Sequence, residues 1–369
     1  MPDADVRRVL MTGDTVGGVW TFTLDLARAL QPWNIEVTLA AMGAEPTEEQ
    51  REDAAAIANL QLMARPYKLE WMEDPWHDVE ESGHWVLDLE QRLAPDVVHL
   101  NSYGHGCLRF HAPVLLTAHS CVLSWWAAVK GETIPVRWNR YWHEVENALN
   151  AVDLLTAPSH AMLRALEENY GTRLPSSRVV RNGRCASGFS PRDKQPMIVA
   201  AGRLWDEAKN ISTLARVAES LEWPVYLAGD DRRPDGSTVD FTGCRKLGRL
   251  STRELAGWYG DAAIYALPAR YEPFGLSILE AALSGCALVL GDIESLRETW
   301  DEAALFVPPD DEGRLRSALC ELIRRPGLRE ELARRSMARA AGLTADRMAR
   351  EYASVYGRFA ATRRTACGL

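Results

Sequence analysis

The chain alternates short apolar runs with longer amphipathic segments, and this alternation most constrains its fold. Residues 6–11 and 36–41 have the length and aliphatic content of buried strands, and helical patterns follow them. Strands that alternate with helices form parallel sheets built from strand–helix–strand units. We therefore expect an α/β fold with doubly wound, Rossmann-like sheets. The first series of strands continues at residues 96–100, 114–118 and 153–157. Helices are expected at 138–149 and 159–170, the second with Ser159 as its N-cap. The acidic and aromatic segment 64–85 shows no clear period, so we expect a loop with short helix there.

A turn-rich break near residues 185–196 separates this series from a second one. At 369 residues the chain is too long for one average core and fits two domains. We predict a first domain over residues 1–185, a second over 196–350, and a helical tail over 351–369 that packs back on the first domain. The second series has predicted strands at 197–201, 225–228, 241–247, 264–266 and 287–290, and predicted helices at 314–325, 328–341 and 344–359.

Composition excludes several classes of protein. Charged residues make up 25% and hydrophobic residues 47%, as in ordinary soluble enzymes, and the net charge of -9 argues against a nucleic-acid partner. No apolar run reaches the ~20 residues of a membrane span, and the N-terminus is not signal-like. The seven cysteines lack CxxC spacing, which favours reduced thiols. We expect a cytoplasmic protein with no transmembrane segment, and peripheral membrane contact stays open.

Tryptophan is the unusual component of the composition. Nine of the 13 tryptophans lie at or before residue 142. Core packing accounts for most of them, but indole faces also stack on sugar rings, so a few are candidates to line an acceptor cleft. The sequence does not say which.

Two carboxylates, Glu272 and Glu280, flank a Pro-Phe-Gly turn that opens a helix. The amides of Phe274, Gly275 and Leu276 would point from the positive end of that helix toward anionic or oxygen-rich ligands. Glu280 lies among apolar residues, so its burial needs a hydrogen-bond donor such as a ribose diol. Such a turn suits a polyol that carries a phosphate. A plain turn residue at 272 and an exposed helix face at 280 are the alternatives.

Arg203 and Lys209 follow the first predicted strand of the second series. Open α/β sheets bind ligands beyond the carboxyl ends of their strands. A guanidinium fork and a lysine point charge together suit a diphosphate. Solvated surface cations are the simpler alternative.

The first half carries weaker signals. Gly17 and Gly18 lie between the first strand and its helix and allow close approach to the backbone, although G-x-G-x-x-G is absent. A tight turn explains them equally well. His119 ends a predicted strand, where it is either a cleft residue or a hydrogen-bonded core residue. His105 is a weaker cleft candidate, and His99 lies inside an apolar strand and is expected in the core.

These motifs together resemble the retaining glycosyltransferases of family 4, the group 1 set with the GT-B fold. The resemblance covers nearly the whole chain and is strongest over residues 196–309, through Ala-Gly-Arg-Leu, Leu-Gly-Arg-Leu and Glu-Pro-Phe-Gly-Leu-Ser-Ile-Leu-Glu-Ala. It implies two Rossmann-like domains that face each other across a cleft. It also implies a hexosyltransferase that moves a sugar from a UDP- or GDP-sugar to a hydroxyl on a glycan, a lipid or a small metabolite. No metal and no other cofactor is implied.

The resemblance also assigns roles to residues. Arg203 and Lys209 would hold the leaving diphosphate, Glu272 would contact the donor sugar, and His119 would hydrogen-bond near its anomeric carbon. Arg203 and Lys209 are six residues apart here, where many relatives have five, and a loop absorbs such an addition. The remaining donor-side positions implied are Gly17, Gly18, Gly248, Arg249, Phe274, Gly275, Leu276 and Glu280.

Three other functions remain open at this point. A UDP-sugar 2-epimerase of similar architecture would form product without an acceptor. A non-catalytic sugar-nucleotide-binding protein would bind UDP or GDP without turnover. An NAD oxidoreductase would need the dinucleotide fingerprint that the sequence lacks. The donor base and sugar, the acceptor, the linkage and the oligomeric state are not encoded in these motifs.

Overall fold

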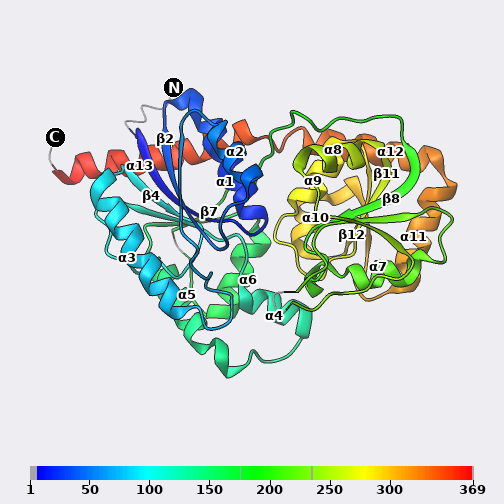
Figure 1. The fold of residues 1–369 in the computed structure, drawn as a ribbon, viewed down its shortest axis with the longest axis horizontal. Coiled ribbons are helices and arrows are strands. Elements are labelled where there is room, and N and C mark those ends of the chain that lie inside the picture. Colours follow the sequence, from blue (N-terminus) through cyan, green and yellow to red (C-terminus); the bar gives the residue numbers. More distant parts are fainter. Residues whose placement is uncertain (1–5, 175, 234–235, 368–369) are drawn as a thin grey trace. The chain divides into compact units, whose positions relative to one another are not determined.

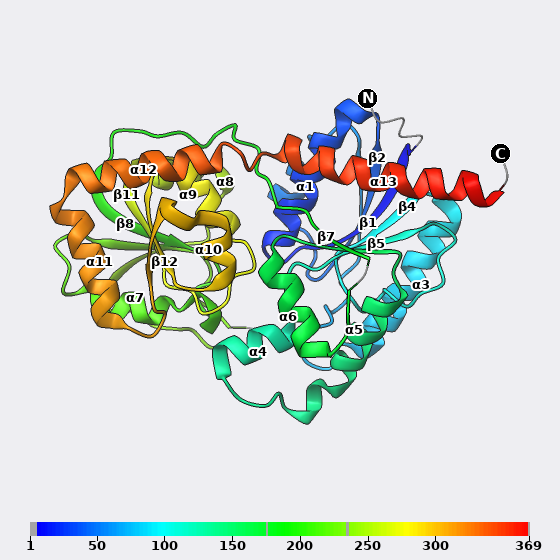
Figure 2. The same cartoon turned by 180° about the vertical axis from the view of Figure 1, so that it is seen from behind.

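The computed structural model describes residues 6–174, 176–233 and 236–367, with side chains up to residue 359. These residues form two compact units, shown from opposite sides in Figures 1 and 2. The first unit comprises the described residues of 1–124, 133–183 and 345–369. The second comprises those of 125–132 and 184–344. Each unit contains one parallel sheet covered by helices.

The sheet of the first unit has seven parallel strands among the described residues, in the order β3-β2-β1-β4-β5-β6-β7. Because β2 and β4 lie on opposite sides of β1, the strand order reverses between β1 and β4, and this is the topological switch point of the sheet. The strands are β1 (Arg8–Asp14), β2 (Glu36–Met42), β3 (Leu60–Ala64), β4 (Val97–Leu100), β5 (Val114–Thr117), β6 (Leu154–Ala157) and β7 (Ser177–Val179).

Successive side chains of β1 pack into two different cores. Val9 and Met11 join the cluster that holds residues of α1 and α13, whereas Leu10 joins the cluster that holds residues of α3, α5 and α6. All three side chains are almost fully buried, as expected of a parallel strand covered on both faces. The helices are α1 (Gly18–Leu30), α2 (Glu48–Ala55), α3 (Trp76–Leu93), α5 (Asn139–Ala151), α6 (His160–Tyr170) and α13 (Ala345–Cys367), with short 3-10 turns η1 (Gln31–Trp33) and η2 (Val136–Trp138). The helix α4 (Val122–Lys130) begins in the first unit and belongs to the second from Trp125 onward.

The C-terminal helix α13 is part of the first unit. It packs along α1, and both views show it crossing that unit. Two buried tyrosines join it to the strands: the Tyr356 hydroxyl lies 2.8 Å from His99 Nδ1, and the Tyr352 hydroxyl lies 3.1 Å from Thr117 Oγ1. His99 also bonds Thr117 through Nε2 at 2.7 Å, so this histidine is the core residue that its apolar strand predicts.

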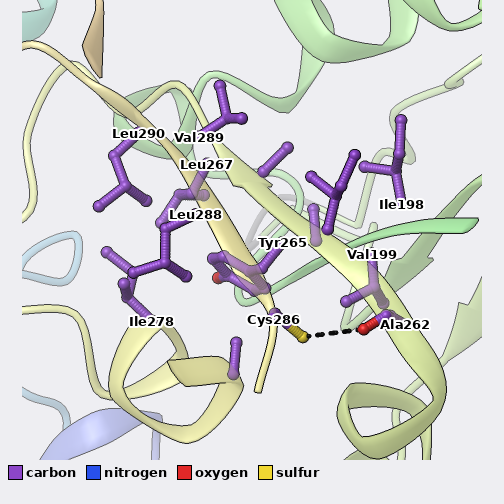
Figure 3. Close-up of a cluster of buried hydrophobic side chains, with 14 of the residues drawn as sticks. Ile198, Val199, Ala262, Tyr265, Leu267, Ile278, Cys286, Leu288, Val289 and Leu290 are labelled. Carbon is purple, nitrogen blue, oxygen red and sulfur yellow. Dashed lines mark hydrogen bonds between the residues drawn. The ribbon is translucent and has the colours of Figure 1, made fainter. Parts of the chain in front are cut away.

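The sheet of the second unit has six parallel strands among the described residues, in the order β10-β9-β8-β11-β12-β13, and its switch point lies between β8 and β11. Figure 3 shows its core, where Val199 of β8, Tyr265 of β11 and Leu288 of β12 lie close together. The strands are β8 (Gln195–Ala201), β9 (Val225–Ala228), β10 (Cys244–Gly248), β11 (Ala262–Leu267), β12 (Ala287–Gly291) and β13 (Ala304–Val307). The helices are α7 (Ile211–Ala218), α8 (Thr252–Asp261), α9 (Leu276–Leu283), α10 (Glu294–Trp300), α11 (Glu312–Arg324) and α12 (Pro326–Ala340), with η3 (Glu207–Lys209) and η4 (Asp301–Ala303).

The structure confirms most predicted elements and corrects others. The helix predicted at 138–149 is α5, and Ser159 caps α6 as expected, because its hydroxyl accepts a hydrogen bond from the Met162 amide at 3.2 Å. The prediction for residues 64–85, a loop with short helix, was wrong at both ends: β3 reaches Ala64, and the long helix α3 begins at Trp76. The apolar stripe of α3 is sparse and continues past residue 85, so the shorter segment shows no clear period.

We predict that replacing Tyr356 by Ala destabilises the protein by about 3–5 kcal/mol, because it empties a fully buried ring site and removes the bond to His99. The control is Arg347→Ala, an exposed position on the same helix, which should change stability by at most about 0.5 kcal/mol. Urea unfolding measures both. Equal effects of the two substitutions would show that α13 is not part of the core of the first unit.

Candidate functional site

The switch point of the second sheet brings together Glu272 and Lys209, the carboxylate and the cation that the sequence motifs indicate. Arg203 and Lys209 follow β8, and Glu272 follows β11, the strand beside it. Lys209 Nζ donates to Glu272 Oε2 at 2.5 Å. The exposed fractions of the two side chains are 16% and 11%, so the pair is shielded but still open to a ligand. A charge-assisted hydrogen bond in such a setting holds both groups in one geometry.

The loop from Arg203 to Lys209 is organised by Asp206. The Asp206 carboxylate accepts hydrogen bonds from Arg203 Nη2, the Ala208 amide and Trp125 Nε1, each at 3.0 Å. Burial alone would raise the pKa of this carboxyl, but the Arg203 and Lys209 cations, helped by the indole and amide donors, hold that pKa below its usual range. Asp206 is also the N-cap of the short 3-10 turn η3, in which Lys209 lies.

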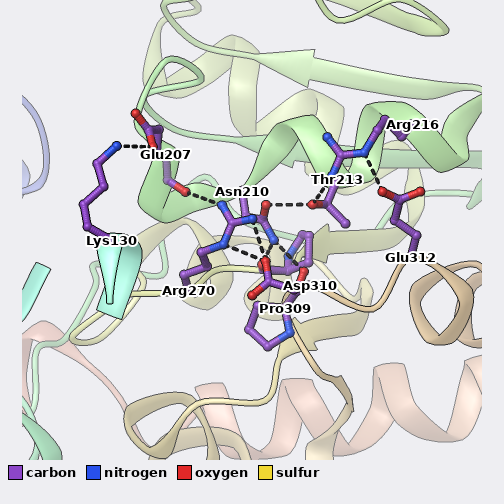
Figure 4. Close-up of polar contacts among 10 residues, drawn as sticks. Lys130, Glu207, Asn210, Thr213, Arg216, Arg270, Pro309, Asp310 and Glu312 are labelled. Carbon is purple, nitrogen blue, oxygen red and sulfur yellow. Dashed lines mark hydrogen bonds and ion pairs between the residues drawn. The ribbon is translucent and has the colours of Figure 1, made fainter. Parts of the chain in front are cut away.

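Asn210 anchors the end of this loop to the segments that follow β11 and β13, and Figure 4 shows its contact with Pro309. Its Nδ2 donates to the carbonyl oxygens of Pro268 at 2.9 Å and Pro309 at 2.6 Å. Arg270, which follows β11, donates from Nη1 to the Glu207 carbonyl at 3.2 Å. The loop that carries Lys209 is therefore bonded directly to the segment that carries Glu272.

The Pro-Phe-Gly turn leads into α9 as the motif predicts. Gly275 caps the helix with φ at 88°, and a Cβ atom there would lie 2.5 Å from Ile278 Cδ1, so only glycine fits without strain. The Phe274 ring is buried, and its amide donates to Glu272 Oε1 at 3.3 Å. Leu276 is the first residue of the helix. The turn thus orients Glu272, while the ligand contacts of these amides stay a prediction.

Glu280 has a protein partner that the sequence did not indicate. Arg184 Nε donates to Glu280 Oε1 at 2.7 Å, and both side chains are about nine-tenths buried. Arg184 lies 96 residues away in the chain, within the turn-rich break, so no local pattern relates it to α9. The ion pair satisfies the buried carboxylate that we expected a ribose diol to satisfy, and ribose binding stays a prediction.

Gly248 and Arg249 lie at the end of β10, the edge strand of the second sheet. Gly248 adopts φ of 71°, and its carbonyl accepts a hydrogen bond from the Gly229 amide at 2.8 Å. Both residues are exposed. If this stretch contacts the nucleobase of the donor, as the family resemblance implies, it would do so through its backbone.

His119 follows β5 in the first unit and forms a hydrogen bond through Nε2 to Asn101 Oδ1 at 2.8 Å. Because Asn101 Nδ2 donates to the Thr12 carbonyl at 2.6 Å, its Oδ1 is the acceptor, and His119 Nε2 carries the proton. Burial against Phe22 lowers the pKa of His119 to about 3. The imidazole is therefore neutral near pH 7 and suited to hydrogen bonding rather than to proton relay.

Gly17 and Gly18 lie at the start of α1, beyond the end of β1. Gly17 adopts φ of 107°, and no atom lies within 4 Å of the position of a Cβ there. The turn before it is held by Asp14, whose Oδ1 accepts a hydrogen bond from the Val16 amide at 2.8 Å. These residues border the switch point of the first sheet.

That switch point contains a cavity of about 50 Å³ that the sequence motifs did not locate. Its walls include Glu70, Ser102 and His105. His105, the weaker histidine candidate, is buried there, and burial lowers its pKa to about 4. Glu70 lies in the segment 64–85, whose sequence has no clear hydrophobic period. The sequence therefore did not indicate that Glu70 lines this cavity.

No described helix has both the length and the apolarity that a membrane crossing requires.

We predict that Arg184→Met destabilises the protein by about 3–5 kcal/mol, because it removes the cation that is hydrogen-bonded to the buried Glu280 carboxylate. Adding Glu280→Leu to that variant should recover much of the loss, since the buried carboxylate is then removed as well. Chemical denaturation of the three proteins tests this. A double variant less stable than Arg184→Met would contradict the account.

Two family models match the chain. Residues 16–184 match the model described as Glycosyltransferase Family 4, and residues 195–325 match the one described as Glycosyl transferases group 1. Among curated proteins, glycogen synthase of Mycobacterium tuberculosis is 27% identical over 70% of this chain and 67% of its own length. Sulfoquinovosyl transferase SQD2 of Arabidopsis thaliana is 24% identical over 60% of this chain, and the match spans 46% of that relative, about half its length.

Solved structures show the same fold. Sucrose-phosphate synthase from Thermosynechococcus elongatus superimposes with a TM-score of 0.79 at 17% identity, over 96% of this chain and all of that one. Anabaena Alr3699/HepE in complex with UDP-glucose superimposes with a TM-score of 0.73 at 13% identity, over 94% of this chain and 98% of that one. The two Rossmann-like units and the GT-B class are thereby confirmed.

Proposed function

The chain belongs to the glycosyltransferases of family 4 (group 1), and we propose that it transfers a hexosyl group from a nucleoside-diphosphate sugar to a hydroxyl acceptor with retention of configuration. A UDP- or GDP-sugar is the proposed donor, and a glycan, a lipid or a small metabolite the proposed acceptor. The observation that carries the proposal is the Lys209–Glu272 pair beside Arg203 at the switch point of the second sheet.

The charges of this site suit a departing diphosphate. As the bond between the anomeric carbon and the phosphate oxygen breaks, negative charge collects on the diphosphate and the sugar gains oxocarbenium character. Arg203 and Lys209 would bind that charge as it forms, which lowers the barrier. These two cations and the helix-start amides supply the positive charge in the proposal, which therefore includes no metal ion and no other cofactor.

The acceptor oxygen would attack from the face that the diphosphate leaves. Its proton would pass to the leaving phosphate oxygen, so no carboxylate is needed as a nucleophile. Glu272 would bind hydroxyls of the donor sugar, and Glu280, held by Arg184, would reach the ribose. His119 is neutral and its Nε2 proton is held by Asn101, so its unprotonated Nδ1 would accept a hydrogen bond from a hydroxyl near the anomeric carbon.

The relatives support a nucleotide-sugar donor. The Anabaena structure holds UDP-glucose, and glycogen synthase and sulfoquinovosyl transferase are named for sugar transfer. We place the enzyme in the cytoplasm because its described cysteines form no disulfide with one another and its composition is that of a soluble enzyme.

We predict that Lys209→Ala and Glu272→Ala each lower kcat by about 10²–10³-fold or more, since each removes a preorganised contact to the reacting groups. Arg334→Ala is the matched control, because Arg334 is an exposed cation that pairs with Glu331 at 2.8 Å within α12. Initial rates with a labelled donor measure all three. Normal turnover in either site variant would refute the assignment.

The donor itself is predicted to stabilise the folded protein by mass action, by about 2.7 kcal/mol at a hundredfold excess over Kd. Thermal unfolding with UDP-, GDP- and ADP-sugars identifies the base. Glu280→Gln should weaken, severalfold, the binding of the nucleotide sugar that stabilises the wild type. The nucleotide sugars that do not stabilise the wild type should not stabilise this variant either. If no nucleotide sugar shifts the melting temperature, the proposed function fails.

A further inference from the structure

The cavity at the switch point of the first sheet has a wall rich in hydrogen-bonding side chains. It lies where β1 and β4 end, the position at which open α/β sheets bind ligands. One water needs roughly 10–15 Å³ of such volume, so about 50 Å³ holds three to five groups of that size. That is the size of one edge of a sugar or cyclitol ring. Polar residues of the wall include Thr12, Asp14, Glu70, Asn101, Ser102 and His105.

Glu70 presents a fixed pair of oxygens in this wall. Its Oε1 accepts a hydrogen bond from the Tyr103 amide at 3.1 Å, and its Oε2 accepts one from the Gly104 amide at 2.5 Å. A Cβ atom on Gly104 would lie 3.1 Å from Oε2 and 2.9 Å from Val79 Cγ1, so glycine permits this approach. Each carboxylate oxygen retains a second lone-pair direction. Two hydroxyl groups on neighbouring carbons of a ligand could therefore each donate a hydrogen bond to one of these oxygens.

Ser102 offers a further acceptor, because the hydrogen-bond network determines where its proton lies. Ser82 Oγ donates to the Val79 carbonyl at 3.0 Å, so it accepts from His105 Nε2 at 2.9 Å. The neutral His105 ring then has a bare Nδ1, which accepts the Ser102 hydroxyl proton at 3.2 Å. The lone pairs of Ser102 Oγ are left for a donor in the cavity.

The charges of the wall disfavour an anionic ligand. Glu70 and Asp14 are carboxylates, and the cation of the wall, Lys68, donates from Nζ to the carbonyls of Glu73 and Asp74 at 3.2 and 3.4 Å. Two of the three N–H donors of Lys68 are therefore engaged, so a phosphate would face two carboxylates and one remaining ammonium N–H. Trp71 adds an apolar surface on which the C–H face of a ring can pack.

We propose that this cavity binds the acceptor through two neighbouring hydroxyls of an uncharged sugar or cyclitol, with both hydroxyls donating to Glu70, and that it rejects the phosphorylated form. This inference rests on the proposed function, which it supplies with an acceptor class. It also makes Trp71 the tryptophan that borders this acceptor site.

The protonation state of Glu70 then controls acceptor binding. Burial raises the pKa of Glu70 to about 7, opposed by the Gly104 and Tyr103 amides and reinforced by the nearby carboxylates. Protonation removes an acceptor site, so the ionised form binds best and affinity falls as the pH drops below 7. The titratable groups that face Glu70 are Asp14 from β1, Lys68 from its own segment, His105 from the loop after β4, Glu144 and Tyr141 from α5, and Tyr170 from α6.

The test is binding of neutral polyols to the whole enzyme by saturation-transfer NMR and calorimetry, with myo-inositol, methyl α-glucoside and their phosphate monoesters as probes. We expect a neutral probe to bind the wild type near pH 8 and about tenfold more weakly near pH 6, where about a tenth of Glu70 is ionised. Each phosphate ester should bind more weakly than its parent. Glu70→Gln should bind at least about tenfold more weakly near pH 8 and lose the pH dependence.

Two variants complete the design. Ser102→Ala should also weaken polyol binding, with the pH dependence kept, and Glu73→Gln, an exposed acid on the same segment, should behave as the wild type. Equal thermal stabilisation of every variant by the donor nucleotide shows that each is folded. The proposal is overturned if a phosphate ester binds more tightly than its parent, if Glu70→Gln binds as the wild type does, or if neither neutral probe binds at millimolar concentration. If the donor stabilises the enzyme but no polyol binds, this inference fails while the proposed transferase function still holds. If no donor stabilises the enzyme, the proposed function itself fails.

Discussion

The hydrogen-bonded ion pair of Lys209 and Glu272 is the interaction on which the site of the second unit depends. It joins a loop that follows β8 to a turn that follows β11, and these strands are neighbours at the switch point of the sheet. Asp206, Asn210 and Arg270 hold the same loop from three other directions. Cations fixed in this way need little reorganisation when charge develops on a leaving group, which is the basis of electrostatic catalysis.

The first unit repeats this topology with different chemistry. Its switch point has a cavity lined by carboxylates and hydroxyl groups, whereas the switch point of the second unit has the ion pair and Arg203. Thr12 lies in the wall of that cavity and also accepts from Asn101, the partner of His119. The same topology thus positions a cationic site in one unit and the proposed polyol-binding site in the other. The strand order determines where the side chains gather, and the loops determine their charge.

Local sequence patterns predicted much of the fold. Strand and helix periods identified two α/β series, and strand-end positions selected Arg203, Lys209 and Glu272, which the structure brings together around one ion pair. Patterns of this kind describe what one segment buries, so they could not pair Glu280 with Arg184, 96 residues away. Glu70 was missed for a related reason, since its segment has no period and its burial depends on the loop after β4.

The central claim, that Lys209 binds the donor diphosphate, is tested most directly by calorimetric binding of the cognate nucleoside diphosphate and of its nucleoside to the wild type and to Lys209→Met. The account predicts that the diphosphate binds the wild type more tightly than the nucleoside does, and that the variant loses about tenfold or more of this difference while its nucleoside affinity is kept. An undiminished difference in the variant would contradict the account.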